Sequence, residues 1–149
     1  MATHMDWQEL IYTRADSDVL REIHAAIDRG DLLEGLTGLE EMINLMSKRE
    51  AHELRSRLAV LMAHVLKWKT QPPTASWADT IATQREEIAE LRDEAPRFTR
   101  AYIVAREWEK ALRKAQRWAR SEMGQGPAVD TLTWEEVFEA EYRLPDDET

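Results

Sequence analysis

The chain has 149 residues, a length typical of one domain with a sizeable core. Its net charge of −9 argues against general binding to nucleic acid or anionic membranes. It contains no cysteine, which excludes disulfides and thiolate metal sites and fits a reducing cytoplasm. We find no secretion signal and no apolar run near the roughly 18 to 20 residues of a membrane span. We therefore expect a single cytoplasmic domain over 1–149, with its core over 6–141 and a frayed tail over 142–149.

The first third of the chain predicts three helices. A short amphipathic turn or helix is expected over 6–12, and a longer helix begins at the N-cap cluster 16–18 and ends at Gly30. Residues 31–35 then form a short connector, and the next helix covers about 37–46. The apolar residues of this third helix share one face: Leu36, Leu39, Ile43 and Met46.

A central helix is predicted over 47–70, and the rest of the chain is expected to pack around it. Ser47 and Glu50 have the spacing of a capping box at its start, and Pro72 with Pro73 stops it. Further apolar residues lie outside its main row, which is typical of a helix packed on several sides. The main row follows steps of four, three, four and three: Leu54, Leu58, Leu61, Val65 and Trp68.

Three more helices are predicted after the proline loop. Ser76 caps the fourth helix, Pro96 lies in the first turn of a long fifth helix, and Gly124 ends that helix. Thr133 begins the last short helix with a capping box. No segment alternates with period two, so no sheet is predicted. The predicted fold class is all-α: a single-domain bundle of about six helices around the central helix near 47–70.

The middle of the chain resembles a known bacterial family from about residue 30 to residue 96. His64-Val-Leu-Lys-Trp68 is followed by Gln71-Pro72, by Ser76-Trp77 and by Gln84-Arg85. These segments are similar to those of the bacterial domain-of-unknown-function family numbered twenty-nine. The sequence departs from that family at Glu41-Met-Ile-Asn44, where the family tends to have Glu-Glu-Ile-Glu. The resemblance implies an all-helical protein of a bacterial cytoplasm and implies no activity.

One candidate site surrounds His64. A histidine beside tryptophan suits a general base or a residue that recognises a small ligand. The alternative is a core histidine that is hydrogen-bonded to the loop at 71–76, since one histidine without a defined acid or nucleophile is not a catalytic site. The group, either a ligand site or a structural cluster, consists of His64, Trp68, Gln71, Trp77, Gln84 and Arg85.

The second candidate site is a basic stripe on the long fifth helix. It fits the phosphates of a nucleic acid or an acidic protein partner. Alternatively, it is solvated or is covered by the acidic segment 130–141, which the negative net charge favours. The stripe occupies a narrow arc opposite the apolar side of the helix: Arg106, Lys110, Arg113, Arg117 and Arg120.

Motifs for other chemistry are missing from the sequence. No Glu-x-x-His pair, His-Glu-x-x-His motif or phosphate-binding glycine loop occurs, so we expect neither a metal nor a cofactor. We expect a non-enzymatic module that associates with itself or with another protein through apolar helix faces; an exposed patch near Trp7, Trp118 or Trp134 in the folded monomer would support this expectation. The alternatives are binding of nucleic acid or an acidic partner by the basic stripe and a small-molecule site around His64.

Overall fold

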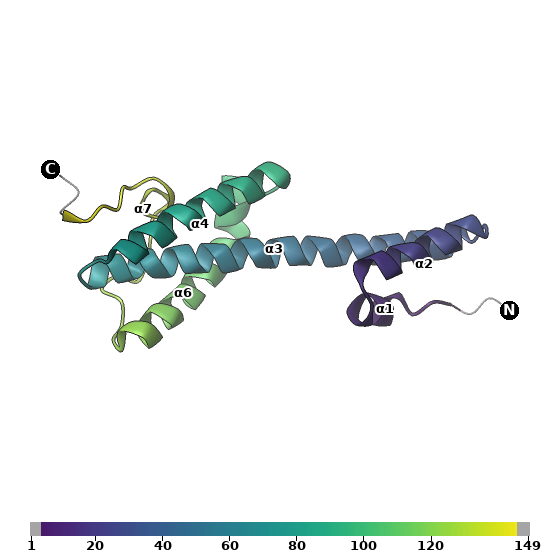
Figure 1. Cartoon of the computed structure of the whole chain (residues 1–149), viewed down its shortest axis with the longest axis horizontal. Helices are drawn as coiled ribbons and strands as arrows, with labels where there is room; N and C mark the ends of the chain where they lie inside the picture. The colour runs from purple at the N-terminus through teal and green to yellow at the C-terminus, as the bar shows by residue number, and fades with distance from the viewer. Residues whose placement is uncertain (1–3, 146–149) are drawn as a thin grey trace. The chain divides into compact units, whose positions relative to one another are not determined.

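The computed structural model describes residues 4–145, and every regular element in them is helical. This confirms the predicted all-α class. None of the helices in this part of the chain combines the length and apolarity of a membrane span. In chain order the elements are α1 (Trp7–Thr13), α2 (Asp16–Asp28), α3 (Leu32–Thr70), α4 (Ala75–Glu94), α5 (Arg100–Tyr102), the π-helical segment η1 (Ile103–Glu107), α6 (Trp108–Met123) and α7 (Trp134–Phe138) (Figure 1).

Contacts between residues divide the chain into two compact units, Met1–His52 and Glu53–Thr149. Helix α3 belongs to both, because it contributes its first part to the N-terminal unit and its second part to the C-terminal unit. Each unit has a cluster of buried apolar side chains of its own. The count of one domain stays a prediction.

Helix α3 is longer than the predicted central helix. The connector over 31–35, the separate helix over 37–46 and the capping box at Ser47 are wrong, because α3 runs unbroken from Leu32 to Thr70. No glycine or proline lies between Gly38 and Thr70. Serine in a helix interior costs about half a kcal/mol or less relative to alanine, so the helix formers on both sides override the capping signal at Ser47. The predicted stop before Pro72 is confirmed.

Two glycines inside α3 allow α1 and α2 to pack closely against it. A Cβ added to Gly35 would lie 2.6 Å from Cγ1 of Ile27 on α2. A Cβ added to Gly38 would lie 2.8 Å from the indole ring of Trp7 on α1. Non-bonded carbon atoms prefer about 3.5 to 4.0 Å, so these positions require the absence of a side chain. The glycines therefore serve packing between helices.

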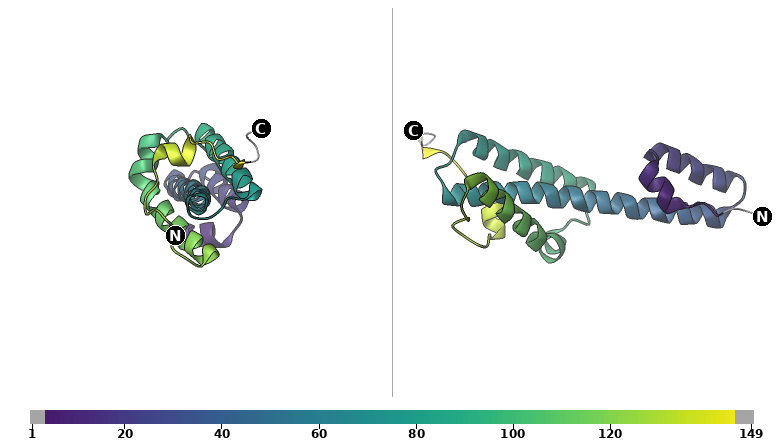
Figure 2. Two further views of the ribbon diagram at one scale, coloured as in Figure 1. Left: turned by 90° about the vertical axis from the view of Figure 1, so that its left-hand side faces the viewer. Right: turned by 90° about the horizontal axis from the view of Figure 1, so that it is seen from below.

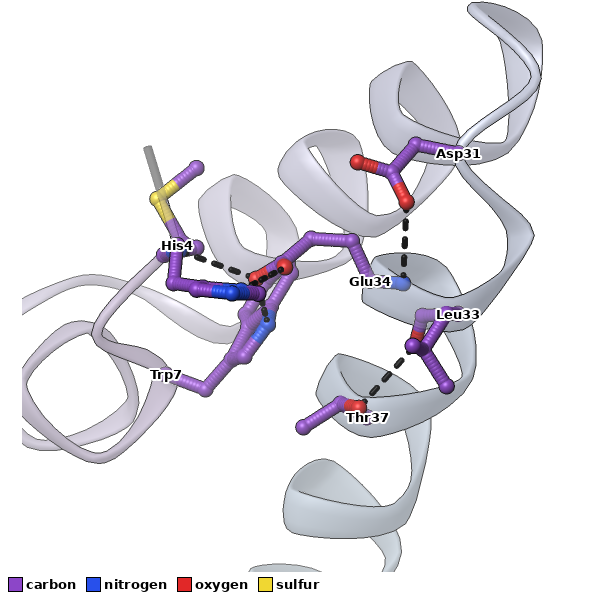
Figure 3. Close-up of polar contacts among 7 residues, drawn as sticks. His4, Trp7, Asp31, Leu33, Glu34 and Thr37 are labelled. Carbon is purple, nitrogen blue, oxygen red and sulfur yellow. Dashed lines mark hydrogen bonds and ion pairs between the residues drawn. The ribbon is translucent and has the colours of Figure 1, made fainter. Parts of the chain in front are cut away.

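One buried carboxylate ties the start of the chain to α3 (Figure 3). Glu34 accepts hydrogen bonds from Nε1 of Trp7 at 2.8 Å and from the backbone N–H of Met5 at 2.9 Å, and Nδ1 of His4 lies 3.3 Å from its Oε2. Burial raises the pKa of Glu34, but these hydrogen bonds outweigh it and hold the pKa below its usual value. The apolar core beside this carboxylate consists of Trp7, Ile11, Val19, Ile23, Met42 and Leu45.

The second part of α3 lies between α4 and α6 in the C-terminal unit (Figure 2). Small side chains of α6, Ala111, Ala115 and Ala119, are fully buried and allow a close approach. The predicted row on the central helix is confirmed as core up to Val65, whereas Trp68 is half-buried. The largest fully buried side chains of the unit are Leu54, Leu58, Leu61, Met62, Val65, Leu66, Ile88, Phe98, Ile103 and Val137.

Several helix starts differ from the prediction. The cluster 16–18 does not cap α2, because Ala15 is the N-cap residue and makes no side-chain capping bond. Thr74 caps α4 in place of Ser76, since its hydroxyl accepts from the backbone N–H of Trp77. The long fifth helix starts at Arg100 rather than near Pro96, and η1 interrupts its α-helical geometry.

Two predicted helix ends are confirmed. Thr133 forms a capping box with Glu136 at the start of α7. Gly124 follows the last residue of α6 with φ of 73°, a left-handed conformation that glycine adopts without strain. These short-range signals succeed because they depend on neighbouring residues alone.

We expect Gly38→Ala to destabilise the N-terminal unit. Alanine gains about 1 kcal/mol of helix propensity over glycine, but its methyl group would overlap the Trp7 ring, and overpacking costs about 1–3 kcal/mol. Chemical denaturation followed by tryptophan fluorescence should show a net loss of about 1 kcal/mol. Asn44→Ala, at an exposed position of the same helix, is the control and should be neutral or stabilising. Equal stability of the two variants would contradict the packing role of Gly38.

Candidate interaction surfaces

His64 lies half-buried on the second part of α3. Its Nδ1 donates a hydrogen bond to the carbonyl oxygen of Val60, one turn earlier, at 2.8 Å, rather than to the loop at 71–76. Burial lowers the pKa of His64, and the nearby positive charge of Lys67 adds to this effect, although the hydrogen bond to Val60 opposes it. A ring whose donor is used within its own helix fits a structural residue.

Three other members of the predicted cluster, Trp77, Gln71 and Gln84, make no hydrogen bond with His64 within residues 4–145. The ammonium group of Lys67, which is buried, pairs with Glu122 and lies 5.2 Å from the centre of the Trp77 ring. Gln71 is half-buried, and its backbone N–H donates to the carbonyl of Lys67 at 2.9 Å. The Oε1 atom of Gln84 is buried without a hydrogen-bond partner in the described chain. None of these contacts joins His64.

Trp68 and Arg85 meet at Tyr142, which sequence reasoning missed. The Trp68 and Tyr142 rings lie edge to face with centroids 5.4 Å apart, and the Arg85 guanidinium lies 5.4 Å from the Tyr142 ring. Arg85 also donates from Nε to the carbonyl of Val137 at 2.8 Å. These contacts tie α7 to α4, and the segment after α7 to α3 and α4. Tyr142 is therefore packed, although it begins the predicted frayed tail; residues 146–149 of that tail lie outside the described residues. A ligand site in this group stays a prediction.

A buried ion pair at the end of η1 was also missed. Glu107 is 3% exposed and accepts from Nε and Nη2 of Arg55 at 2.6 and 3.2 Å. The hydrogen bonds to Glu107 raise the pKa of Arg55. The pair is bidentate, a geometry that satisfies both partners. Among residues 4–145, no group of three or more histidine or acidic side chains is placed to hold a metal ion.

The predicted basic stripe is exposed along its whole length. The acidic segment that follows pairs elsewhere: Glu135 lies 3.7 Å from Arg100, and Glu136 pairs with Lys69 of α3. Arg113 has a loose contact of 4.0 Å with Glu109 of its own helix. The stripe is thus a solvated cationic face, and its role in binding stays a prediction. Its five exposed members are Arg106, Lys110, Arg113, Arg117 and Arg120.

The N-terminal unit has an extensive exposed apolar surface, which we call the α2–α3 face. Of the large apolar side chains that are exposed in the described chain, all but Tyr12 and Val104 belong to this face. Their exposed fractions range from 39% to 74%, so a large part of each side chain is accessible to solvent. Its members are Leu20 and Ile27 of α2 and Leu32, Leu33, Leu36, Leu39, Ile43 and Met46 of α3.

The α2–α3 face is continuous across two helices. On α3, Leu32, Leu36, Leu39, Ile43 and Met46 follow steps of four, three, four and three, which place them in one row. Ile27 of α2 lies over Gly35, the neighbour of Leu36 in the chain. Figure 2 shows α2 running alongside the first part of α3. Ile27 therefore borders the row on α3, and Leu20 lies seven residues earlier, two turns away on the same side of α2.

An exposed patch at Trp7, Trp118 or Trp134 would support the interaction module, but none of these three side chains is exposed. Trp7 is 3% exposed because it packs into the N-terminal core. Trp118 and Trp134 are half-buried: Nζ of Lys114 lies 4.8 Å from the Trp118 ring, and Trp134 stacks on Trp108 with centroids 5.8 Å apart. The exposed apolar surface lies instead on the helix face predicted from the spacing of Leu36, Leu39, Ile43 and Met46.

We expect the free energy of unfolding to fall as pH decreases through the range in which histidine titrates. The pKa of His64 is lowered in the folded protein, so the unfolded chain binds this proton more readily. The loss should begin below about pH 6.5 and be complete below the native pKa. Denaturation curves across this range should show a weaker pH dependence for His64→Gln. An unchanged dependence, or an NMR titration midpoint at or above about 6.5, would contradict this account.

Comparison with known proteins agrees with the resemblance in the sequence. A family model described as "Domain of unknown function DUF29" matches residues 31–143, from just before α3 to beyond α7. The match includes the part of the α2–α3 face on α3 and leaves out Leu20 and Ile27 of α2. No curated protein and no solved structure matches the chain. Because the match covers most of its length, the chain belongs to the DUF29 family.

Proposed function

We propose that this protein is a non-enzymatic interaction module whose binding surface is the α2–α3 face. The observation that carries the proposal is the continuous row of exposed apolar side chains on well-formed helices. The exposed fractions of the eight side chains equal about four whole aliphatic side chains. Monomeric soluble proteins rarely expose contiguous apolar patches larger than a few hundred Å², and larger ones mark interaction sites.

The chemistry of the face favours protein binding. Its row on α3 contains no charged side chain, so the face offers contact area rather than a reactive group. Apolar anchors at steps of three and four are the pattern by which one helix docks on another. The partner that fits is therefore a protein surface that is helical and apolar.

The energetics require a partner with a matching apolar surface. Burying about four aliphatic side chains contributes roughly 6–12 kcal/mol, at about 1.5–3 kcal/mol each. Association costs roughly 4–15 kcal/mol in lost translational and rotational freedom. The free energy gained by burying the apolar side chains of this chain alone is thus similar to the cost of association. A stable complex therefore also needs a comparable apolar area on the partner.

The buried charged side chains of the described chain give no support to an alternative site for a substrate. Glu34 and Glu107 are both satisfied by hydrogen bonds within their own unit. Lys67 is paired with Glu122. These groups stabilise the fold, and none of them points to a bound substrate.

Photo-cross-linking inside living cells tests this proposal without assuming a partner. A photoreactive amino acid at Ile43, in the middle of the face, should give a discrete adduct of defined mass on a denaturing gel, because a bound protein lies within its reach. The same amino acid at Lys48, exposed on α3 outside the face, is the matched control and should give none. Absence of a discrete adduct at Ile43, or the same adduct at both positions, would contradict the proposal.

A further inference from the structure

We infer that the α2–α3 face binds a second copy of this chain, and that the two α2–α3 hairpins form a four-helix bundle. This inference rests on the proposed function, because it names the partner of the same surface. The hairpin consists of α2, the short turn at 29–31 and the first part of α3. Gly30, with φ of 85°, makes the turn possible without strain.

On both helices of the hairpin, apolar side chains extend beyond the ones that are buried, and on α3 they cover more than one side. On α2, Val19, Ile23 and Ala26 are buried, while Leu20 and Ile27 are 47% exposed. On α3, Met42 and Leu45 are buried, whereas the row from Leu32 to Met46 is open. A helix that is apolar on more than one side is normally packed on more than one side. The hairpin is therefore one layer of a two-layer helical structure.

A second hairpin covers this face better than a single helix does. The exposed apolar residues come from two adjacent helices, and a lone partner helix along the α3 row would leave Leu20 and Ile27 in water. Two layers of two helices are the arrangement of a four-helix bundle, whose core positions follow the spacing of the α3 row. A second copy supplies such a layer.

Two-fold symmetry makes the face complementary to itself. A two-fold axis sets the same patch of both copies against each other, so an uncharged apolar row meets an uncharged apolar row. Near one end of the face, Nη1 of Arg49 already pairs with Oδ2 of Asp16 at 2.6 Å. Because all members of the row are uncharged, the contact buries no unpaired charge of the row.

The exposed area fits the requirement of a stable dimer. The open apolar surface amounts to about four whole aliphatic side chains in each copy. With the polar groups at its edge, this is on the order of the ~800 Å² that each partner contributes to a stable interface. Apolar contact is insensitive to screening, so the dimer should persist in salt.

Light scattering after size-exclusion chromatography tests the inference on the purified full chain. We expect a mass twice the 17.4 kDa of one chain, at both low and high salt. Leu36→Glu combined with Ile43→Glu should give a monomer with unchanged helical circular dichroism. The matched control is Thr37→Glu combined with Asn44→Glu, which adds the same charges at the same spacing on exposed positions of α3 outside the row; it should remain dimeric.

A milder pair of substitutions keeps the test decisive if the glutamate variant fails to fold. Leu36→Ala combined with Ile43→Ala retains helix propensity and should raise the dissociation constant of the dimer at least about tenfold. A wild-type monomer at all concentrations overturns the inference, as does a dimer that dissociates in salt or is unaffected by both row variants. If the wild type is monomeric but Ile43 still cross-links in cells, a different protein is the partner and the proposed function stands. If the monomer also gives no cross-link, both fail.

Discussion

Helix α3 carries apolar surface on more sides than its neighbours in the N-terminal unit cover. Gly35 and Gly38 allow α2 and α1 to approach one side of it so closely that a methyl group would clash. This close packing leaves the row from Leu32 to Met46 without a cover. In the C-terminal unit, by contrast, the second part of α3 is enclosed and most of its large apolar side chains are fully buried, although Trp68 is half-buried. The difference between these two parts of one helix is the basis of the proposed function.

The spacing of apolar residues in the sequence predicts well which residues share a helix face. It predicts poorly whether another helix packs on that face. The all-α class, the end of α3 before Pro72 and the capping box at Thr133 follow from residues close together in the chain. The same rules predict a break at Ser47 that does not exist, because a local capping signal is weaker than the helix formers around it. The spacing from Leu36 to Met46 identifies an apolar face but does not tell whether another helix packs on it.

The candidate sites show the same limit. Periodicity places the five cations of the basic stripe correctly on one solvated face. It does not reveal that His64 bonds to Val60 of its own helix, or that Trp68 and Arg85 meet at Tyr142 about 60 to 75 residues later in the chain. Pairs such as Arg55 with Glu107 depend on how distant helices pack, and a single sequence contains no signal for that geometry.

A distance measurement between two copies tests the central claim most directly. Because the chain has no cysteine, Ser47→Cys gives a single attachment point for a nitroxide spin label at an exposed position next to Met46. Double electron–electron resonance on the labelled protein should show one defined distance between labels. That signal should disappear when the labelled chain is mixed, unfolded and refolded with a large excess of unlabelled chain. If the labelled protein shows no defined distance between labels even at high protein concentration, the result would contradict the account that a second copy covers the α2–α3 face.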